Sequence, residues 1–209
     1  MQSKAPTIEV AQPKLFTAGA VATVCAYGAL LALPFFLSVL VVSVTRFSLL
    51  TAVIPLAVVA GSAYFLPFGF GNPHVTRLVR SLRPAATEDG AGFIVQLTLS
   101  PRLRSGLRAL LEDADDIGYL TVREDELHFQ GDSVKLSIPL DRIERVQPQN
   151  IGLRGLFVYG RRIKVVVPDL PQVESIEFAE RSSSLLPASR AITKRLYQRL
   201  SARIPQPTK

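Results

Sequence analysis

The stretch GYLTVREDELHFQGDSVKLSIPLDRIERV, residues 118–146, decides the architecture expected for the C-terminal part of the chain. Apolar and polar side chains alternate in short runs, and this period of two is typical of strands with one buried face. Short polar breaks at 124–126 and 131–132 separate the runs, as hairpin turns do. The stretch predicts consecutive antiparallel strands at 118–123, 126–130 and 133–138.

The alternation continues toward the C-terminus and then gives way to helical spacing. Further strands are expected at 142–147, 153–159, 162–167 and 174–179. After Pro187 the apolar residues recur at i+4 spacing, which predicts an amphipathic closing helix. Its apolar stripe is Ala188, Ile192, Leu196 and Leu200, and its polar side carries Arg190, Lys194, Arg195, Arg199 and Arg203. Short, evenly spaced strands of this kind indicate a small antiparallel barrel or sandwich.

Two more elements are expected ahead of this region. Residues 93–99 are rich in β-branched and aromatic side chains and predict a strand. Residues 100–114 begin with serine and proline, a favourable helix start, and place leucines on one side and arginines on the other. We expect this helix to pack on the sheet. The alternative is that it lies on a membrane with its arginines at the headgroups.

A long uncharged region occupies the N-terminal third of the chain. Between Lys14 and Arg77, Arg46 is the one charged residue. The apolar runs on both sides of Arg46 reach the length of about 20 residues that a helix needs to cross a bilayer. The pattern predicts a transmembrane helical hairpin with spans at 15–44 and 48–68 and a turn at 45–47.

Cations at the ends of this region predict its orientation. Arg77, Arg80 and Arg83 follow the second span, whereas Arg46 alone lies in the connection. Because cytoplasmic flanks carry an excess of Lys and Arg, we expect a multi-pass protein of the inner membrane with both termini in the cytoplasm. Arg46 is interpreted as part of the outer turn, the alternative being a functional charge held within the membrane. Small residues spaced by four in both spans offer a face for helix packing or self-association.

The predicted fold class is a membrane protein of the α+β type. It divides into a cytoplasmic tail at 1–14, the hairpin at 15–68, a juxtamembrane linker at 69–92, a cytoplasmic β-domain at 93–203 and a tail at 204–209. The net charge is +7, and basic residues are interspersed with acidic ones. A lipid bilayer with anionic headgroups is a natural partner for such a domain, the alternative being ordinary surface charge. Nucleic acid is not expected as a partner, because no basic stripe alternates with aromatic residues.

The order of elements and one apolar motif resemble the pleckstrin-homology-like (PH-like) superfamily, in particular its GRAM and bacterial PH-like branch. In such domains a strand pair of the pattern L-x-V…L-x-F precedes x-x-I-P-L-x-x-I-x-x-V. The matching residues are Leu120, Val122, Leu127, Phe129, Ile138, Pro139, Leu140, Ile143 and Val146. The resemblance covers 118–203 and implies a PH-like small antiparallel β-barrel with a C-terminal helix, behind the two-helix membrane anchor. The elements at 93–114 lie outside this pattern.

Four cations gather around the hairpin expected at 153–167, namely Arg154, Arg161, Arg162 and Lys164. Basic hairpin tips of PH-like domains contact phospholipid headgroups, so the resemblance implies the same role for these residues. The alternative is an exposed basic hairpin that discourages pairing between sheet edges.

No reactive constellation is found in the sequence. His74 and His128 are far apart and near no cysteine, so ligand spacing for a metal is missing, and no nucleophile stands beside a base. The acidic run at 112–116 is interpreted as the solvated end of a helix, the alternative being a cation site made by Glu112, Asp113, Asp115 and Asp116. We therefore expect no catalytic residue, metal or cofactor.

The predicted function is that of a membrane-anchored, non-catalytic binding or scaffolding protein that presents a PH-like domain and contacts anionic lipid headgroups. The alternative is a protein-interaction subunit of a larger membrane assembly, with contacts to another membrane protein. A membrane enzyme is the least expected of the three.

Overall fold

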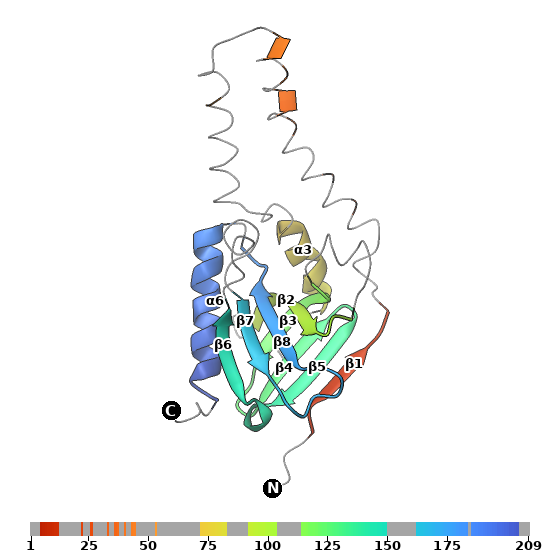
Figure 1. The fold of residues 1–209 in the computed structure, drawn as a ribbon, viewed down its shortest axis with the longest axis vertical. Coiled ribbons are helices and arrows are strands. Elements are labelled where there is room, and N and C mark those ends of the chain that lie inside the picture. The colour runs from red at the N-terminus through yellow and green to blue at the C-terminus, as the bar shows by residue number, and fades with distance from the viewer. Residues whose placement is uncertain are drawn as a thin grey trace.

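The computed structural model describes residues 5–12, 72–82, 92–103, 114–149, 162–183 and 185–204, together with isolated helical positions between 22 and 53. Within these residues, eight strands form one antiparallel sheet in the order β1-β5-β4-β3-β2-β8-β7-β6 (Figure 1). The strands are β1 (Thr7–Val10), β2 (Gly92–Ser100), β3 (Asp116–Val122), β4 (Glu126–Gly131), β5 (Val134–Pro139), β6 (Arg145–Gln149), β7 (Arg162–Val166) and β8 (Ser175–Glu180). The helices are α3 (Asn72–Val79) and α6 (Leu186–Ser201), with short 3-10 turns η2 (Arg80–Leu82) and η3 (Leu140–Arg142).

The alternation seen in the sequence corresponds to the two faces of this sheet. In β4, Leu127 and Phe129 are fully buried on the core face, whereas His128 between them is on the other face and half-buried. Phe129 meets Phe178 of β8 across the core, with their ring centroids 6.2 Å apart. Buried residues of β2 through β8 and of α6 form one cluster, so the core lies between the curved sheet and this helix.

The opposite face of the sheet is covered in part by α3 and η2. Val79 is fully buried there against Ile117 and Tyr119 of β3, and Leu82 packs against the same cluster. Two helices thus contact the sheet from different sides, α6 over β6, β7 and β8 and α3 over β3 (Figure 1).

Strands β3 and β4 approach each other closely at a pair of glycines. Gly118 lies opposite Gly131 in the register. A Cβ atom on Gly118 would stand 2.2 Å from the carbonyl oxygen of Gln130, which is backbone and cannot turn aside. Glycine at position 118 is therefore required by the close approach of two backbones.

The structure differs from the predicted strand arrangement in two places. The strand expected at 93–99 exists as β2, and its place in the middle of the sheet, between β3 and β8, was not predicted. Residues 7–10, expected to belong to a tail, form the edge strand β1 and pair with β5. Because neither pairing joins segments that are close in sequence, no short-range pattern predicts it. The strand expected at 153–159 and most of the helix expected at 100–114 lie outside the described residues.

The closing helix forms as α6, but its buried stripe is offset from the predicted one. Leu196 and Leu200 are buried as expected, whereas Ile192 is half-buried and Thr193 takes the inner position. The Thr193 hydroxyl donates to the carbonyl oxygen of Ser189 at 2.9 Å, which allows a polar side chain to be buried there.

The predicted fold class is wrong. The described part is one eight-stranded antiparallel sheet with two helices, and no pairing between its described strands joins β1 to β6 to close a small barrel. No helix in the described ranges has the length and apolar character that crossing a membrane requires. This finding contradicts the transmembrane hairpin and the multi-pass inner-membrane localisation. Apart from isolated positions, the expected spans at 15–44 and 48–68 lie outside the described residues.

The residues expected to set the membrane topology are placed as follows. Arg77 is exposed on α3, and Arg80 is exposed at the start of η2. Arg46 and Arg83 lie outside the described residues.

Candidate binding surfaces

Two of the four predicted headgroup-binding cations, Arg162 and Lys164, are described, and both lie on β7. They occupy alternate positions of one strand and therefore share a face of the sheet. Arg154 and Arg161 lie outside the described residues. Lys164 is the register partner of Glu177 on β8, so the two described cations flank one carboxylate.

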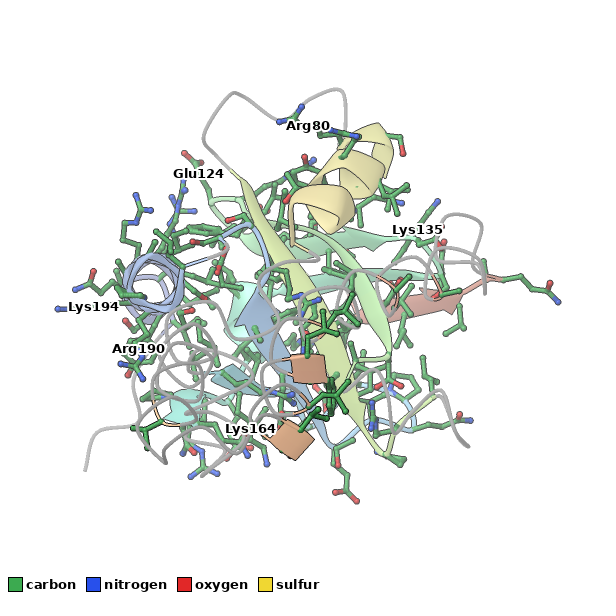
Figure 2. The ribbon with its side chains drawn as sticks, turned by 90° about the horizontal axis from the view of Figure 1, so that it is seen from above. Arg80, Glu124, Lys135, Lys164, Arg190 and Lys194 are labelled. Atoms are coloured by element: carbon green, nitrogen blue, oxygen red, sulfur yellow. The ribbon has the colours of Figure 1, made fainter. Side chains whose placement is uncertain are left out.

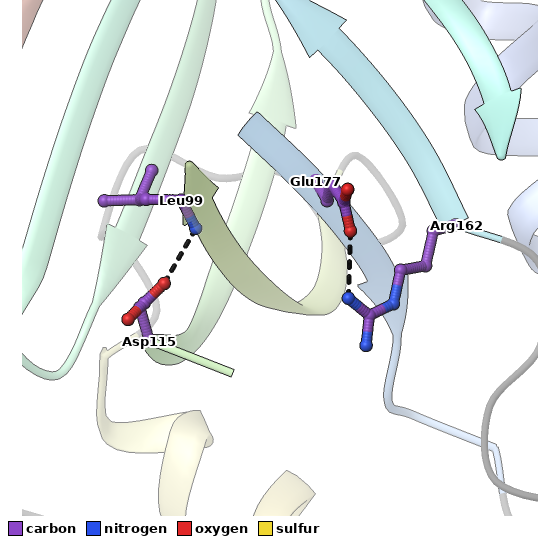
Figure 3. Close-up of polar contacts among 4 residues, drawn as sticks. All are labelled: Leu99, Asp115, Arg162 and Glu177. Carbon is purple, nitrogen blue, oxygen red and sulfur yellow. Dashed lines mark hydrogen bonds and ion pairs between the residues drawn. The ribbon is translucent and has the colours of Figure 1, made fainter. Parts of the chain in front are cut away.

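Arg162 is turned into the protein rather than toward solvent. Its Nη1 donates to Oε2 of Glu177 at 2.9 Å, and the residue is 3% exposed (Figure 3). Only 4% of the arginine side chain and 18% of the glutamate side chain are accessible, so water screens this ion pair weakly. The carboxylate offsets the charge of Arg162 within the sheet. Lys164, half-buried, is the more accessible cation of the two.

The same face of β2 continues this polar arrangement. Thr98 is the register partner of Glu177 from the side opposite to Lys164, and Gln96 lies two residues away on the same face. Gln96 and Thr98 are both buried. A row of polar side chains therefore runs across β2, β8 and β7, with the Arg162–Glu177 pair within it.

The acidic run at 112–116 proves to be structural at its described end. Asp115 and Asp116 are 1% and 2% exposed, which contradicts their interpretation as a solvated helix end. Oδ2 of Asp115 accepts a hydrogen bond from the N–H of Leu99 at 2.7 Å, which ties the start of β3 to the end of β2 (Figure 3). Glu112 and Asp113 lie outside the described residues.

Asp116 connects the start of β3 to the turn between β4 and β5. Its Oδ2 accepts from the N–H groups of Ser133 and Val134 at 2.8 and 2.6 Å, and its Oδ1 accepts from the N–H of Ile117 at 2.9 Å. These bonds hold the turn between β4 and β5 against β3. In the described ranges, no group of three or more His, Cys, Asp and Glu residues could hold a metal ion.

The outer face of α6 is a second basic surface, which we call the basic helix face and define by Arg190, Lys194, Arg195 and Arg199. Lys194 and Arg195 are exposed, and Arg190 and Arg199 are half-buried. Figure 2 shows Arg190 and Lys194 pointing away from the sheet.

These cations form two pairs at i+4 spacing, Arg190 with Lys194 and Arg195 with Arg199, and therefore line two sides of the helix. Between the pairs runs a stripe of exposed uncharged residues, namely Pro187, Ala191, Gln198 and Ala202. Because these residues are exposed and uncharged, a broad anionic partner could approach both rows of cations across them.

One charge pattern in the sequence marks this surface. Residues 181–209 contain seven Lys and Arg and no Asp or Glu, whereas basic and acidic residues are interspersed along residues 112–180. The sequence places these cations on the polar side of the helix, and their role as a binding surface was not predicted. The signal was the absence of acidic residues near these cations in the sequence.

The comparisons with known proteins add no relative to this picture: no family model matches the chain, and no curated protein matches it.

Proposed function

We propose that the chain is a non-catalytic binding module, and that it contacts anionic phosphate-bearing lipid headgroups through the basic helix face. The exposed cations Lys194 and Arg195, on a helix without acidic residues, carry the proposal. This role agrees with the binding function that the resemblance to the PH-like superfamily implies. It moves the proposed contact from the hairpin cations, of which Arg162 is buried and paired, to α6.

The geometry of α6 supports a surface contact rather than a deep pocket. Lys and Arg have long apolar stems, so cations on both sides of a helix can reach phosphates while the stems cover uncharged residues between them. Each basic residue held near an anionic membrane contributes about 1 kcal/mol, and salt weakens the contribution. We therefore expect the four cations of the basic helix face to give a reversible, salt-sensitive attachment.

Vesicle binding by the full chain tests this role. The chain is sedimented with phosphatidylcholine vesicles, alone and with phosphatidylserine added, over a series of salt concentrations. Neutralising two cations in Lys194→Gln/Arg195→Gln removes about 2 kcal/mol of attraction, so binding to the anionic vesicles should weaken about thirtyfold. The binding that remains without phosphatidylserine should not change.

The matched control is Arg77→Gln/Arg80→Gln, which removes the same charge from exposed positions on α3 and η2. The proposal requires this control to bind like the wild type. Equal losses in both double variants would assign the binding to net charge, and an unchanged Lys194→Gln/Arg195→Gln variant would eliminate the basic helix face.

A further inference from the structure

The N-terminal strand β1 is attached to the sheet through one neighbour. It pairs with β5 in the register Thr7↔Ser137, Ile8↔Leu136, Glu9↔Lys135 and Val10↔Val134, and it pairs with no other described strand. The N–H of Ala11 extends the ladder by donating to the carbonyl oxygen of Ser133 at 2.7 Å. The other side of β5 is taken by β4, so β1 occupies the outer edge of β5.

Few side chains of this segment enter the core. Ile8, opposite the buried Leu136, packs against the core cluster, and Pro6 is buried just ahead of the strand. Thr7 and Glu9 are exposed, and Val10 is 58% exposed. The segment is therefore held by main-chain hydrogen bonds and a small apolar anchor, which are contacts that another extended chain can reproduce.

One charge pair gives this edge a chemical preference. Glu9 lies directly opposite Lys135, and both side chains are exposed. Figure 2 labels Lys135. Opposite charges at such a position favour pairing, and a like charge in the incoming strand would disfavour it. An exposed lysine on an edge strand also disfavours non-specific pairing with other strands. The edge thus suits an acidic residue that directly follows an apolar one.

We propose that the outer edge of β5 is a docking edge for an extended peptide of a partner protein, with an apolar residue opposite Leu136 and an acidic residue opposite Lys135. Residues 5–12 of the chain itself occupy the edge as an internal competitor. Because they belong to the same chain, their effective concentration is high, and a partner must displace them. This inference is independent of the basic helix face.

The first test measures binding of a fluorescein-labelled peptide with the sequence of residues 4–14, KAPTIEVAQPK, to the full chain by anisotropy. Ile8→Asp weakens the internal competitor and leaves the β5 edge unchanged, so the labelled peptide should bind this variant at least tenfold more tightly than the wild type. Leu185→Asp introduces the same residue at another exposed apolar position, 51% exposed before α6, and should bind like the wild type.

The second test examines the charge preference in the Ile8→Asp background. Adding Lys135→Glu should weaken binding of the labelled peptide severalfold. A peptide that carries lysine at the Glu9 position should bind this double variant better than the original peptide does. Equal affinity of both peptides for it would remove the charge pair from the proposal.

A disulfide that joins β1 to β5 tests the proposal in a second way, which does not depend on how Ile8→Asp affects folding. Glu9→Cys/Lys135→Cys, made together with Cys25→Ser, joins residues that are directly opposite, at a separation that suits a disulfide. The oxidised chain should not bind the peptide, and reduction should restore binding. Equal binding by the oxidised and reduced chains would overturn the proposal. The proposal would also fail if the wild type were a dimer that Ile8→Asp converts to a monomer. In that case a second copy of the chain would occupy the β5 edge.

Discussion

Asp116 offers the sharpest test of how the sheet is held together, because asparagine has nearly the same shape and lacks only the charge and one acceptor. The aspartate serves three N–H groups: those of Ser133 and Val134 at Oδ2 and that of Ile117 at Oδ1. Asparagine has a single acceptor oxygen. If that oxygen faces the turn, the amide nitrogen faces the N–H of Ile117, and two donors then oppose each other.

The expected loss follows from these contacts. Two hydrogen bonds lose the assistance of a charge, at about 1 kcal/mol each, and one buried N–H loses its acceptor, at about 1–3 kcal/mol. Asp116→Asn should therefore lower the free energy that keeps the β4–β5 turn closed by roughly 3–5 kcal/mol. Water compensates poorly for the lost acceptor, since the aspartate is 2% exposed.

Hydrogen exchange followed by mass spectrometry measures this opening directly. Protection of the Ser133 and Val134 amides should fall by a factor of about 100 or more, because 3 kcal/mol corresponds to roughly that ratio. Asp125→Asn makes the same chemical change at an exposed turn and should leave protection unchanged. If the Asp116→Asn amides keep wild-type protection, the carboxylate does not hold the turn and the reasoning is refuted.

Two further substitutions probe the packing and the buried ion pair. Gly118→Ala should lower the free energy of unfolding by about 1–3 kcal/mol and lower the melting temperature, because the new Cβ would meet the backbone of Gln130 and Gly131. An unchanged melting curve would show that the two strands can move apart there without cost. Glu177→Gln should lower the free energy of unfolding by about 3 kcal/mol, because the buried Arg162 loses the carboxylate that it pairs with. The double variant Arg162→Leu/Glu177→Leu removes both charges and should lose less stability than Glu177→Gln alone. Thermal melting of both variants measures the two losses.

The extent to which sequence predicted this fold depends on how local each determinant is. Strands β3, β4 and β5 were predicted nearly to their ends, because alternation within six or seven residues defines them and short turns join them. Strand β1 was missed because it has four residues and one anchored apolar side chain, Ile8, and its partner strand is far away in the sequence. The central place of β2 was missed for the same reason, since its pairing with β8 joins distant segments.

The candidate sites were harder to predict than the strands. Asp115 and Asp116 resemble a solvated acidic run until the N–H groups of residues 99, 133 and 134 are placed against them. Arg162 resembles a surface cation until Glu177 is found on the neighbouring strand. In each case a charged side chain is buried because a hydrogen-bonding or ion-pairing partner from elsewhere in the chain contacts it. The spacing of residues in the sequence does not predict which partner that is.

The two proposed binding surfaces belong to opposite ends of the strand order. The basic helix face lies on α6, which contacts β6, β7 and β8, whereas the peptide edge is β5, beside β1 (Figure 1). Figure 2 likewise shows Lys194 and Lys135 on different sides of the molecule. Substitutions at the two surfaces have no shared partners, so their effects should be additive. Lys194→Gln/Arg195→Gln should leave peptide binding intact, and Ile8→Asp should leave vesicle binding intact. A chain in which either variant impaired both activities would have one composite surface, and the assignment of two independent roles would fail.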